Sequence, residues 1–276
     1  MILDTIARSA GKRVEQRKQV KSLEQMMKAA CECREREGIK REDIKGEDGT
    51  GGGYSFKAAL SKPGVSFICE VKKASPSKGL IAPDFPYVEI ARQYQEAGAD
   101  AVSVLTEPEF FLGADRYLEE IHGEIGLPLL RKDFTVDEYQ IYEAKVLGAS
   151  AVLLICSLMD MEKLKRYMGI CGSLGLSSLA EAHTDREVAM AAEAGADIIG
   201  INNRNLETFE VDFTNALRLR KLVDRGTIFV AESGIRTPED IELLAENQVD
   251  AVLVGETLMR APDKKRALRE LKSRIG

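Results

Sequence analysis

Four charged side chains occupy the same place in four similar segments of the sequence. Each segment starts with a glycine, continues as an apolar run, and carries a charged residue six positions after the glycine, at Glu70, Lys132, Glu181 and Glu232. Lys72 follows Glu70 by two residues, so both side chains share one face of a strand. Ammonium and carboxylate groups that crowd together shift each other's pKa values and supply acids and bases. The spacing therefore predicts a site of general acid–base chemistry.

Other catalytic groups are scarce. A single charge at a strand end is usually a solvated edge or a surface ion pair, but four in the same position are harder to explain that way. His122 falls in a helix-to-strand connection, and His183 could line the site but has no serine or cysteine nucleophile to pair with. No spacing of His, Asp and Glu indicates a metal, so proton transfer falls to Lys and Glu.

The elements that position these charges follow from a repeat. Gly-Ala-Asp or Gly-Ala-Ser with an apolar run recurs after helical stretches, and a second family of glycine-led runs alternates with it. Such runs are typical of buried parallel strands. The runs are residues 64–71, 98–105, 126–133, 148–155, 175–182, 195–202, 226–233 and 249–256. Eight strands, each followed by a helix, predict an α/β fold, a single (β/α)8 TIM barrel with its site at the C-terminal strand ends.

An open doubly wound sheet is the alternative fold, but the glycine-rich loop with which it binds dinucleotides is missing. The segment from Ile2 to Arg36 is rich in helix formers, so we expect helices there. Residues 1–60 should form an N-terminal helical extension that packs on the barrel of residues 61–276 rather than on a membrane surface. The run Gly49–Gly53 should be a flexible linker, since no strand precedes it.

Composition excludes several classes of protein. The chain has 276 residues, 44% of them hydrophobic, and a net charge of −6 with a pI near 5.3. An acidic chain is a poor non-specific binder of nucleic acid, no stretch is suited to span a membrane, and the N-terminus lacks the order of a signal peptide. Five cysteines without a CxxC, including the isolated Cys31 and Cys33, indicate a reducing cytoplasmic location.

The last two predicted strands end in residues that suit an anion. One ends in Ser233 and Gly234 and the other in Gly255. In TIM barrels the loops after these strands often form a phosphate site, where glycine lets backbone N–H groups approach the ligand. Asn202 closes the sixth strand, and Arg204 follows it by two residues. A small phosphorylated molecule is therefore the expected substrate.

These residues stand in strings that resemble the indole-3-glycerol-phosphate synthase family of tryptophan biosynthesis. The strings are ICEVKKASPSKG, LLRKDF, LAEAHT, GINNRNL, VAESGI and LVGETLM. The similarity extends over nearly the whole chain, and the Glu-x-Lys-x-x-Ser-Pro-Ser-x-Gly block is highly specific. The resemblance implies a carboxy-lyase that converts 1-(2-carboxyphenylamino)-1-deoxyribulose 5-phosphate by ring closure, decarboxylation and dehydration, without a cofactor. It leaves open an association with other tryptophan-pathway enzymes.

The resemblance also implies roles for individual residues. Lys132 resembles the acid that protonates the substrate ketone while the aryl carbon attacks. Glu181 and Lys72 resemble partners in the later proton transfers, and which of them delivers the second proton stays open. Three positions resemble groups that orient the lysines and the substrate hydroxyls: Glu70, Asn202 and Glu232. The ligand-binding positions, with Phe110 as a weaker candidate, are Ser75, Phe111, Leu153, Arg204, Ser233, Gly234, Gly255 and Glu256.

Two points depend on local detail. Burial lowers the pKa of a lysine so that it donates near neutral pH, whereas nearby glutamates raise that pKa again, and the balance decides proton delivery. Glu256 stands where some relatives have a small hydroxyl residue. Its carboxylate would repel a phosphate, so we expect the side chain to point away and only the backbone to contribute.

Three other functions fit parts of the pattern. A Schiff-base barrel enzyme would use Lys132 or Lys72 as an amine, and borohydride trapping of the substrate would separate it from acid catalysis. A phosphoribosyl isomerase of the same fold would rely on other acid–base pairs. The complete set of Lys72, Lys132 and Glu181 disfavours a non-catalytic barrel that has kept only its phosphate site.

Overall fold

Eight parallel strands form a closed barrel in this computed structural model, which describes residues 2–43, 55–205 and 208–275. The strands follow one another around the barrel in chain order, and the last pairs with the first. They are β1 (Ser66–Val71), β4 (Ala101–Leu105), β5 (Leu129–Lys132), β6 (Ala151–Ile155), β7 (Ser177–Ala182), β8 (Ile198–Asn202), β9 (Ile228–Glu232) and β10 (Ala251–Val254). Each lies within one predicted run, so the (β/α)8 prediction is confirmed.

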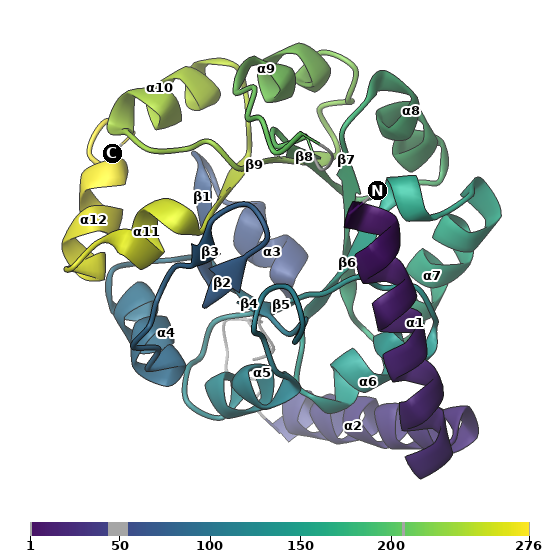
Figure 1. Cartoon of the computed structure of the whole chain (residues 1–276). Coiled ribbons are helices and arrows are strands. Elements are labelled where there is room, and N and C mark those ends of the chain that lie inside the picture. The colour runs from purple at the N-terminus through teal and green to yellow at the C-terminus, as the bar shows by residue number, and fades with distance from the viewer. Residues whose placement is uncertain (1, 44–54, 206–207, 276) are drawn as a thin grey trace.

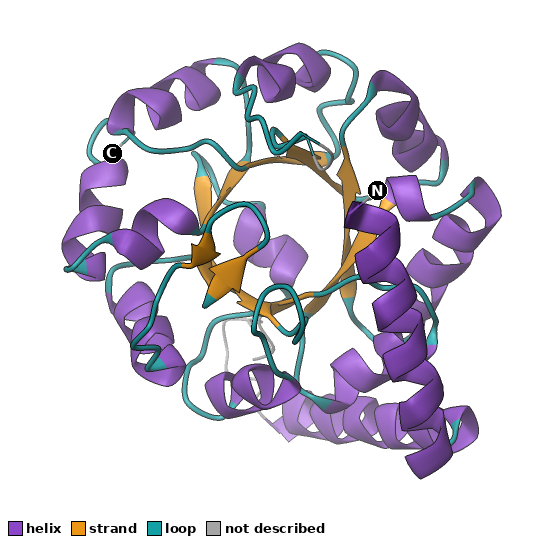
Figure 2. Ribbon diagram, viewed as in Figure 1, coloured by secondary structure: helices purple, strands orange, loops and turns teal. Residues whose placement is uncertain are grey.

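A ring of helices surrounds the strands (Figure 2). Helix α10 (Pro238–Glu246) begins with a capping box: the side chains of Thr237 and Asp240 each accept the backbone N–H of the other residue. Pro238 occupies the first helical position, where its missing N–H costs nothing. Among the described residues no helix is both long and apolar enough to cross a membrane. The ring consists of α4 (Tyr87–Glu96), α5 (Asp115–His122), α6 (Tyr139–Val146), η1 (Cys156–Leu158), α7 (Met161–Ser173), α8 (Asp185–Glu193), α9 (Thr214–Arg220), α10 (Pro238–Glu246), α11 (Glu256–Arg260) and α12 (Lys264–Leu271).

Alternation along the strands divides the apolar side chains into two cores. The outer core, between barrel and helices, includes Phe67, Leu129 and Phe229. The inner core fills the barrel and includes Ile68, Leu130, Leu179 and Val230. Each of these four inner residues stands two positions before one of the repeated charged residues. Since side chains two apart share a face, the charges also point inward, at the mouth of the barrel.

The segment Ile2–Arg36, predicted to be helical, is divided between two helices. They are α1 (Ile2–Val20) and α2 (Leu23–Asp43). The break occurs at Ser22, whose hydroxyl accepts the backbone N–H of Gln25 while the Gln25 side chain accepts the backbone N–H of Ser22. This reciprocal cap starts a new helix. Helix α2 packs on α6, and α1 lies beside the barrel opening (Figure 1).

A short helix, α3 (Phe56–Leu60), contributes Phe56 and Leu60 to the inner core. The Ser66 hydroxyl at the start of β1 donates to the carbonyl of Ala59 over 3.4 Å, which places α3 at the end of the barrel opposite the charges. The division between residues 1–60 and 61–276 stays a prediction, and the run 49–53 lies outside the described residues.

A small hairpin after β1 was not predicted. Its strands, β2 (Ala74–Ser75) and β3 (Gly79–Leu80), pair antiparallel, and the hairpin lies over the barrel opening in Figure 1. The backbone N–H of Ala74 donates to the carbonyl of Phe111 over 3.2 Å. The loop after β1 is therefore joined to the loop after β4 at the mouth.

Substitution of Gly148 tests whether the repeated glycines are needed where the helices end. It follows α6 with φ of 86°, and a Cβ there would lie 2.3 Å from the ring of His122. We expect Gly148→Ala to destabilise the protein by about 2 kcal/mol, because the backbone strain at positive φ adds to the clash of the new Cβ with His122. Gly169→Ala, inside α7 with nothing within 4 Å, should instead stabilise it by about 0.5–1 kcal/mol. Thermal and urea unfolding followed by circular dichroism would measure both, and a loss at both positions would contradict this account.

Candidate active site

A cavity of about 600 Å³ opens at the C-terminal ends of the strands. Its wall is built from side chains that lie far apart in the sequence, and barrel closure brings them together. Apart from the weaker candidate Phe110, it includes every residue predicted to bind or act on the ligand, which are Glu70, Lys72, Ser75, Phe111, Lys132, Leu153, Glu181, Asn202, Arg204, Glu232, Ser233, Gly234, Gly255 and Glu256. The roles of these residues stay predictions.

Lys132, the last residue of β5, is bound by two carboxylates. Its Nζ lies 2.8 Å from Oε2 of Glu181 at the end of β7 and 2.7 Å from Oε2 of Glu232 at the end of β9. The lysine side chain is 14% exposed and the glutamates are 3% and 2% exposed. Charges act on each other more strongly in such a poorly solvated place than at a surface. The site therefore holds an ammonium between two carboxylates.

The balance of burial and charge at Lys132 favours its charged form. Burial lowers the pKa of Lys132, but the charges of Glu181, Glu232 and Glu70 outweigh burial and raise that pKa above its ordinary value. Such a group keeps its proton at neutral pH and is a poor nucleophile. It donates when a stronger base, such as a developing alkoxide, forms beside it.

The two carboxylates around Lys132 differ in their affinity for a proton. Burial raises the pKa of Glu232 to about 7, against the opposing charge of Lys132. Burial also raises the pKa of Glu181, but the charges of Lys132 and His183 and the hydrogen bonds from Lys132 and Asn202 bring it below its ordinary value. Two carboxylates with separated pKa values can divide the work of acid and base. Glu181 is suited to accept a proton and Glu232 to hold one.

His183 lies behind Glu181 and does not line the cavity. Its Nε2 is 3.7 Å from Oε1 of Glu181, and its Nδ1 is 3.5 Å from Oε2 of Glu187. Burial lowers the pKa of His183, but its bond to Glu187 and the charge of Glu181 raise it overall. His183 therefore acts on the site through Glu181 and not by contact with a ligand.

A second ion pair lies beside the first. Lys72 contacts Glu70, and their side chains are 16% and 4% exposed. A Cβ at Gly255 would lie 2.3 Å from Oε1 of Glu70 and 2.9 Å from Nζ of Lys72. Glycine at this position therefore leaves the space that the pair occupies, as expected where a close approach is needed.

The loops after β8, β9 and β10, with the hairpin after β1, form a cationic end of the cavity. Ser233 and Gly234 have φ of 67° and 86°, in the left-handed region that favours glycine and that other residues adopt uncommonly. Arg204 donates to the carbonyl of Phe209 over 3.0 Å. Lys78 and Arg236, which were not predicted, line the same part of the wall. The arrangement can bind a phosphate through backbone N–H groups and nearby cations.

The carboxylate of Glu256 is paired with cations of the cavity wall, and the expectation that only its backbone contributes to anion binding stays a prediction. Its Oε1 lies 3.1 Å from Nε of Arg260 and 3.5 Å from Nζ of Lys78, and its Oε2 lies 3.8 Å from Nη2 of Arg204. Burial raises the pKa of Glu256, but the bonds and charges of Arg260 and Lys78 lower it overall. Three cations thus offset the carboxylate, which reduces its repulsion of an anion.

The opposite side of the cavity is apolar. Phe111 and Leu153 line it as predicted positions, and the ring of Phe134 lies 6.1 Å from that of Phe111. Phe110 does not line the cavity. Residues that were not predicted complete this wall from α1: Ile2, Leu3 and Ile6. Phe134 could have been suspected from the sequence, because it directly follows the charged run Arg131 to Asp133. Nothing in the sequence of α1 indicates that this helix covers the cavity.

Sequence comparison decides the family. A family model described as "Indole-3-glycerol phosphate synthase" matches residues 3–271. The chain belongs to the indole-3-glycerol phosphate synthase family. It is 51% identical over 272 residues to the family member of Endomicrobium trichonymphae, with 99% of this chain and 100% of that protein covered. It is 50% identical to the member of Lachnoclostridium phytofermentans, with 99% of each covered.

Solved structures outside the family share the fold. A 3-hexulose-6-phosphate synthase from Salmonella typhimurium superposes with a TM-score of 0.62 at 14% identity, covering 76% of this chain and 97% of that one. A thiamine phosphate pyrophosphorylase from Pyrococcus furiosus has a TM-score of 0.56 at 19% identity, covering 79% and 96%. At these identities the similarity supports the barrel alone.

The described part of the chain holds no cluster of three or more His, Cys, Asp and Glu side chains placed to bind a metal ion. The lysines of the cavity floor are instead paired with glutamates.

Glu232 gives this site a pH signature. Its raised pKa of about 7, against an ordinary value of 4.5, means that the folded protein binds this proton more tightly than the unfolded chain. The contribution to stability is full below the unfolded pKa and is lost as pH rises through the folded pKa. Glutamine cannot ionise, so Glu232→Gln should not lose this stability as pH rises. We expect the difference in unfolding free energy, variant minus unmodified protein, to increase by on the order of 3 kcal/mol from about pH 5 to about pH 8. Urea unfolding across this range would show it, and a pH-independent difference would contradict the shift.

Proposed function

We propose that this chain converts 1-(2-carboxyphenylamino)-1-deoxyribulose 5-phosphate into indole-3-glycerol phosphate, by ring closure, decarboxylation and dehydration. The observation that carries the proposal is the ammonium of Lys132 held by Glu181 and Glu232 between a cationic end and an apolar wall of one cavity. Membership of the family supports the same reaction. The cavity volume of about 600 Å³ suits a small molecule.

The two ends of the cavity orient the substrate in this proposal. The phosphate binds at Ser233, Gly234 and Gly255, near the cations at this end of the cavity. The anthranilate ring lies against Phe111 and Leu153. The ketone then lies between these ends, at the charged cluster. Binding energy from the ends holds the reacting carbons together, which lowers the entropic part of the barrier.

Lys132 is the acid of ring closure in this scheme. The carboxyl-bearing aryl carbon attacks the ketone carbon, and Lys132 gives its proton to the ketone oxygen, which becomes a hydroxyl. Loss of carbon dioxide returns the electron pair of the broken carbon–carbon bond to the ring and restores its aromaticity. Glu181 and Glu232 hold Lys132 in place throughout and favour its reprotonation.

Loss of water completes the indole. The leaving hydroxyl takes a proton, and the ring carbon next to nitrogen loses one, so that its bonding pair forms the new double bond. We assign the base to Glu181, because its lowered pKa keeps it ionised. Lys72 is then the second acid, with Glu70 in contact to orient it. Asn202 donates to Oε1 of Glu181 over 3.3 Å and directs the base.

The Schiff-base alternative is less well supported. An imine requires a neutral amine, whereas neighbouring carboxylates raise the pKa of Lys132. A cytoplasmic location belongs to the same proposal and is supported by five cysteines without disulfides. Association with other tryptophan-pathway enzymes stays a prediction from the family.

Substitution of Lys132 tests the acid role. With substrate but no added metal or cofactor, the unmodified protein should produce the fluorescence of the indole product. We expect Lys132→Ala to lower turnover by about 10²–10⁴-fold, while the inhibition constant of inorganic phosphate changes by less than about twofold. Lys62→Ala, which removes a cation paired with Asp100 at the opposite end of the barrel over 2.9 Å, is the matched control.

Two outcomes would contradict the proposal in different ways. Equal losses of turnover and phosphate affinity in Lys132→Ala would contradict the acid role. An unmodified protein that binds the substrate without making indole product would contradict the function and favour the binding-barrel or Schiff-base alternatives.

A further inference from the structure

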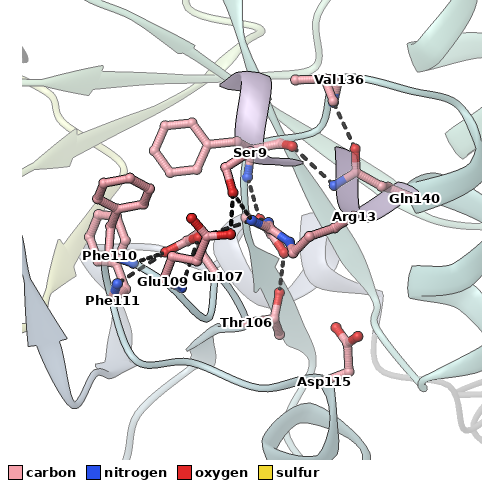
Figure 3. A network of polar contacts seen from close by, with 12 residues as sticks. Ser9, Arg13, Thr106, Glu107, Glu109, Phe110, Phe111, Asp115, Val136 and Gln140 are labelled. Atoms are coloured by element: carbon pink, nitrogen blue, oxygen red, sulfur yellow. Dashed lines mark hydrogen bonds and ion pairs between the residues drawn. The ribbon is translucent and has the colours of Figure 1, made fainter. Parts of the chain in front are cut away.

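Polar residues of helix α1 face the loops that follow β4 and β5 (Figure 3). Ser9, Arg13 and Arg17 are spaced four residues apart, so they share one side of the helix. The Ser9 hydroxyl donates to Oε1 of Glu109 over 2.5 Å, and Arg17 lies 2.5 Å from Asp115 at the start of α5. Arg13, between them, makes the most deeply buried contacts of this row.

One of these contacts is with Glu107, whose side chain is fully buried. Arg13 Nη1 lies 3.0 Å from Oε1 of Glu107. The same carboxylate accepts the backbone N–H groups of Glu109, Phe110 and Phe111 over 3.1, 2.7 and 3.0 Å. A single buried anion thus shapes the loop that carries Phe111 into the cavity, and Arg13 is its countercharge.

The other contact is with Asp133, which directly follows Lys132. Arg13 Nη2 lies 3.2 Å from Oδ1 of Asp133, whose side chain is 4% exposed. Oδ1 also accepts the backbone N–H of Phe134 over 2.8 Å, and Oδ2 accepts the Thr106 hydroxyl over 2.8 Å. The two nitrogens of one guanidinium therefore join the loop after β4 to the loop after β5.

Both loops deliver a ring to the apolar wall of the cavity. The centroids of Phe111 and Phe134 are 6.1 Å apart, and both residues line the cavity beside Ile6. Ile6 stands seven residues before Arg13, about two turns along α1, so it lies on nearly the same side of the helix. Helix α1 thus carries both a piece of the wall and the cation that fixes the rest of it.

We infer that Arg13 is a positioning residue for the aromatic half of the active site. Its guanidinium clamps Glu107 and Asp133 and thereby sets the position of Phe111 and Phe134 against the substrate ring. The inference rests on the proposed function and assigns the N-terminal helix a part in recognising the anthranilate moiety. The phosphate half of the site, at the ends of β9 and β10, does not touch this clamp.

Loss of the clamp has a directed consequence. Without Arg13, two buried carboxylates lose a shared countercharge, which is unfavourable unless the loops move or take up water or protons. The displaced loops would carry the two rings with them. A displacement of about 1 Å near reacting groups can cost up to about a hundredfold in rate, and a misplaced wall also weakens binding of the ring.

Binding of two ligands distinguishes a positioning role of Arg13 from a general destabilisation of the protein. The probes are the substrate reduced with borohydride at its ketone, which cannot cyclise, and inorganic phosphate alone. For Arg13→Gln we expect the Kd of the reduced substrate to rise about tenfold or more, while that of phosphate stays within about twofold. Lys18→Gln, on the same helix and paired with Asp137 over 2.8 Å, is the control and should change neither. Equal weakening of both probes, or of neither, in Arg13→Gln would overturn the inference.

A second variant, Glu107→Gln, tests the clamp without changing Arg13 and stands on its own if Arg13→Gln folds poorly. Alone it should also raise the Kd of the reduced substrate while that of phosphate stays within about twofold, and equal weakening of both or of neither would overturn the inference. Glu107→Gln retains a side-chain carbonyl for the loop amides and removes the charge that Arg13 contacts. In the double variant, Arg13→Gln with Glu107→Gln, the Kd of the reduced substrate should rise by less than the product of the two single increases, because both substitutions break the same interaction. An increase equal to that product would overturn the clamp. An unmodified protein that binds the reduced substrate but forms no indole product would contradict the proposed function and leave this comparison intact.

Discussion

The charge on Lys132 is the quantity on which the rest of the site depends. Removing an ammonium from water costs free energy that only well-placed carboxylates offset. Barrel closure supplies them, because Glu181 and Glu232 lie 49 and 100 residues further along the chain and reach the same nitrogen. The paired ammonium therefore exists only in the folded barrel. Its two partners also differ from each other, since one carboxylate is kept ionised and the other has a raised pKa.

Strand β5 connects this centre to the rest of the molecule through three consecutive charged residues. Arg131 points outward, fully buried against the helices, where its Nη2 lies 2.8 Å from Oε2 of Glu143. Lys132 points inward to the site. Asp133, just beyond the strand, contacts Arg13 of the N-terminal helix. The two-residue period of the strand sends successive charges to the helix layer and to the cavity. One short segment thereby connects the outer core, the charged cluster of the cavity and the N-terminal extension.

Sequence patterns predicted the parts of this molecule that are local and repeated. The barrel followed from the glycine-led strands, and the inward charges followed from their fixed distance to those glycines. The helix break at Ser22 also has a local signal, since Ser22 and Gln25 have the spacing of a capping box. Ile6, Phe134 and Glu107 were missed because their importance comes from where α1 and two loops meet. No period or motif within one segment encodes such a meeting point.

The most direct test of this account is the charge of Lys132 itself. In protein labelled with ¹⁵N-lysine, the Nζ resonance that disappears in Lys132→Ala can be followed from about pH 6 to 10, a range that ends near the ordinary lysine pKa. The account predicts that the resonance stays that of an ammonium throughout, because the surrounding carboxylates raise the pKa of Lys132. The ionisation of Glu232 near pH 7 should shift this signal slightly without removing it. A Lys132 that loses its proton near neutral pH would contradict it, and would make this residue a nucleophilic amine instead of the acid that closes the ring.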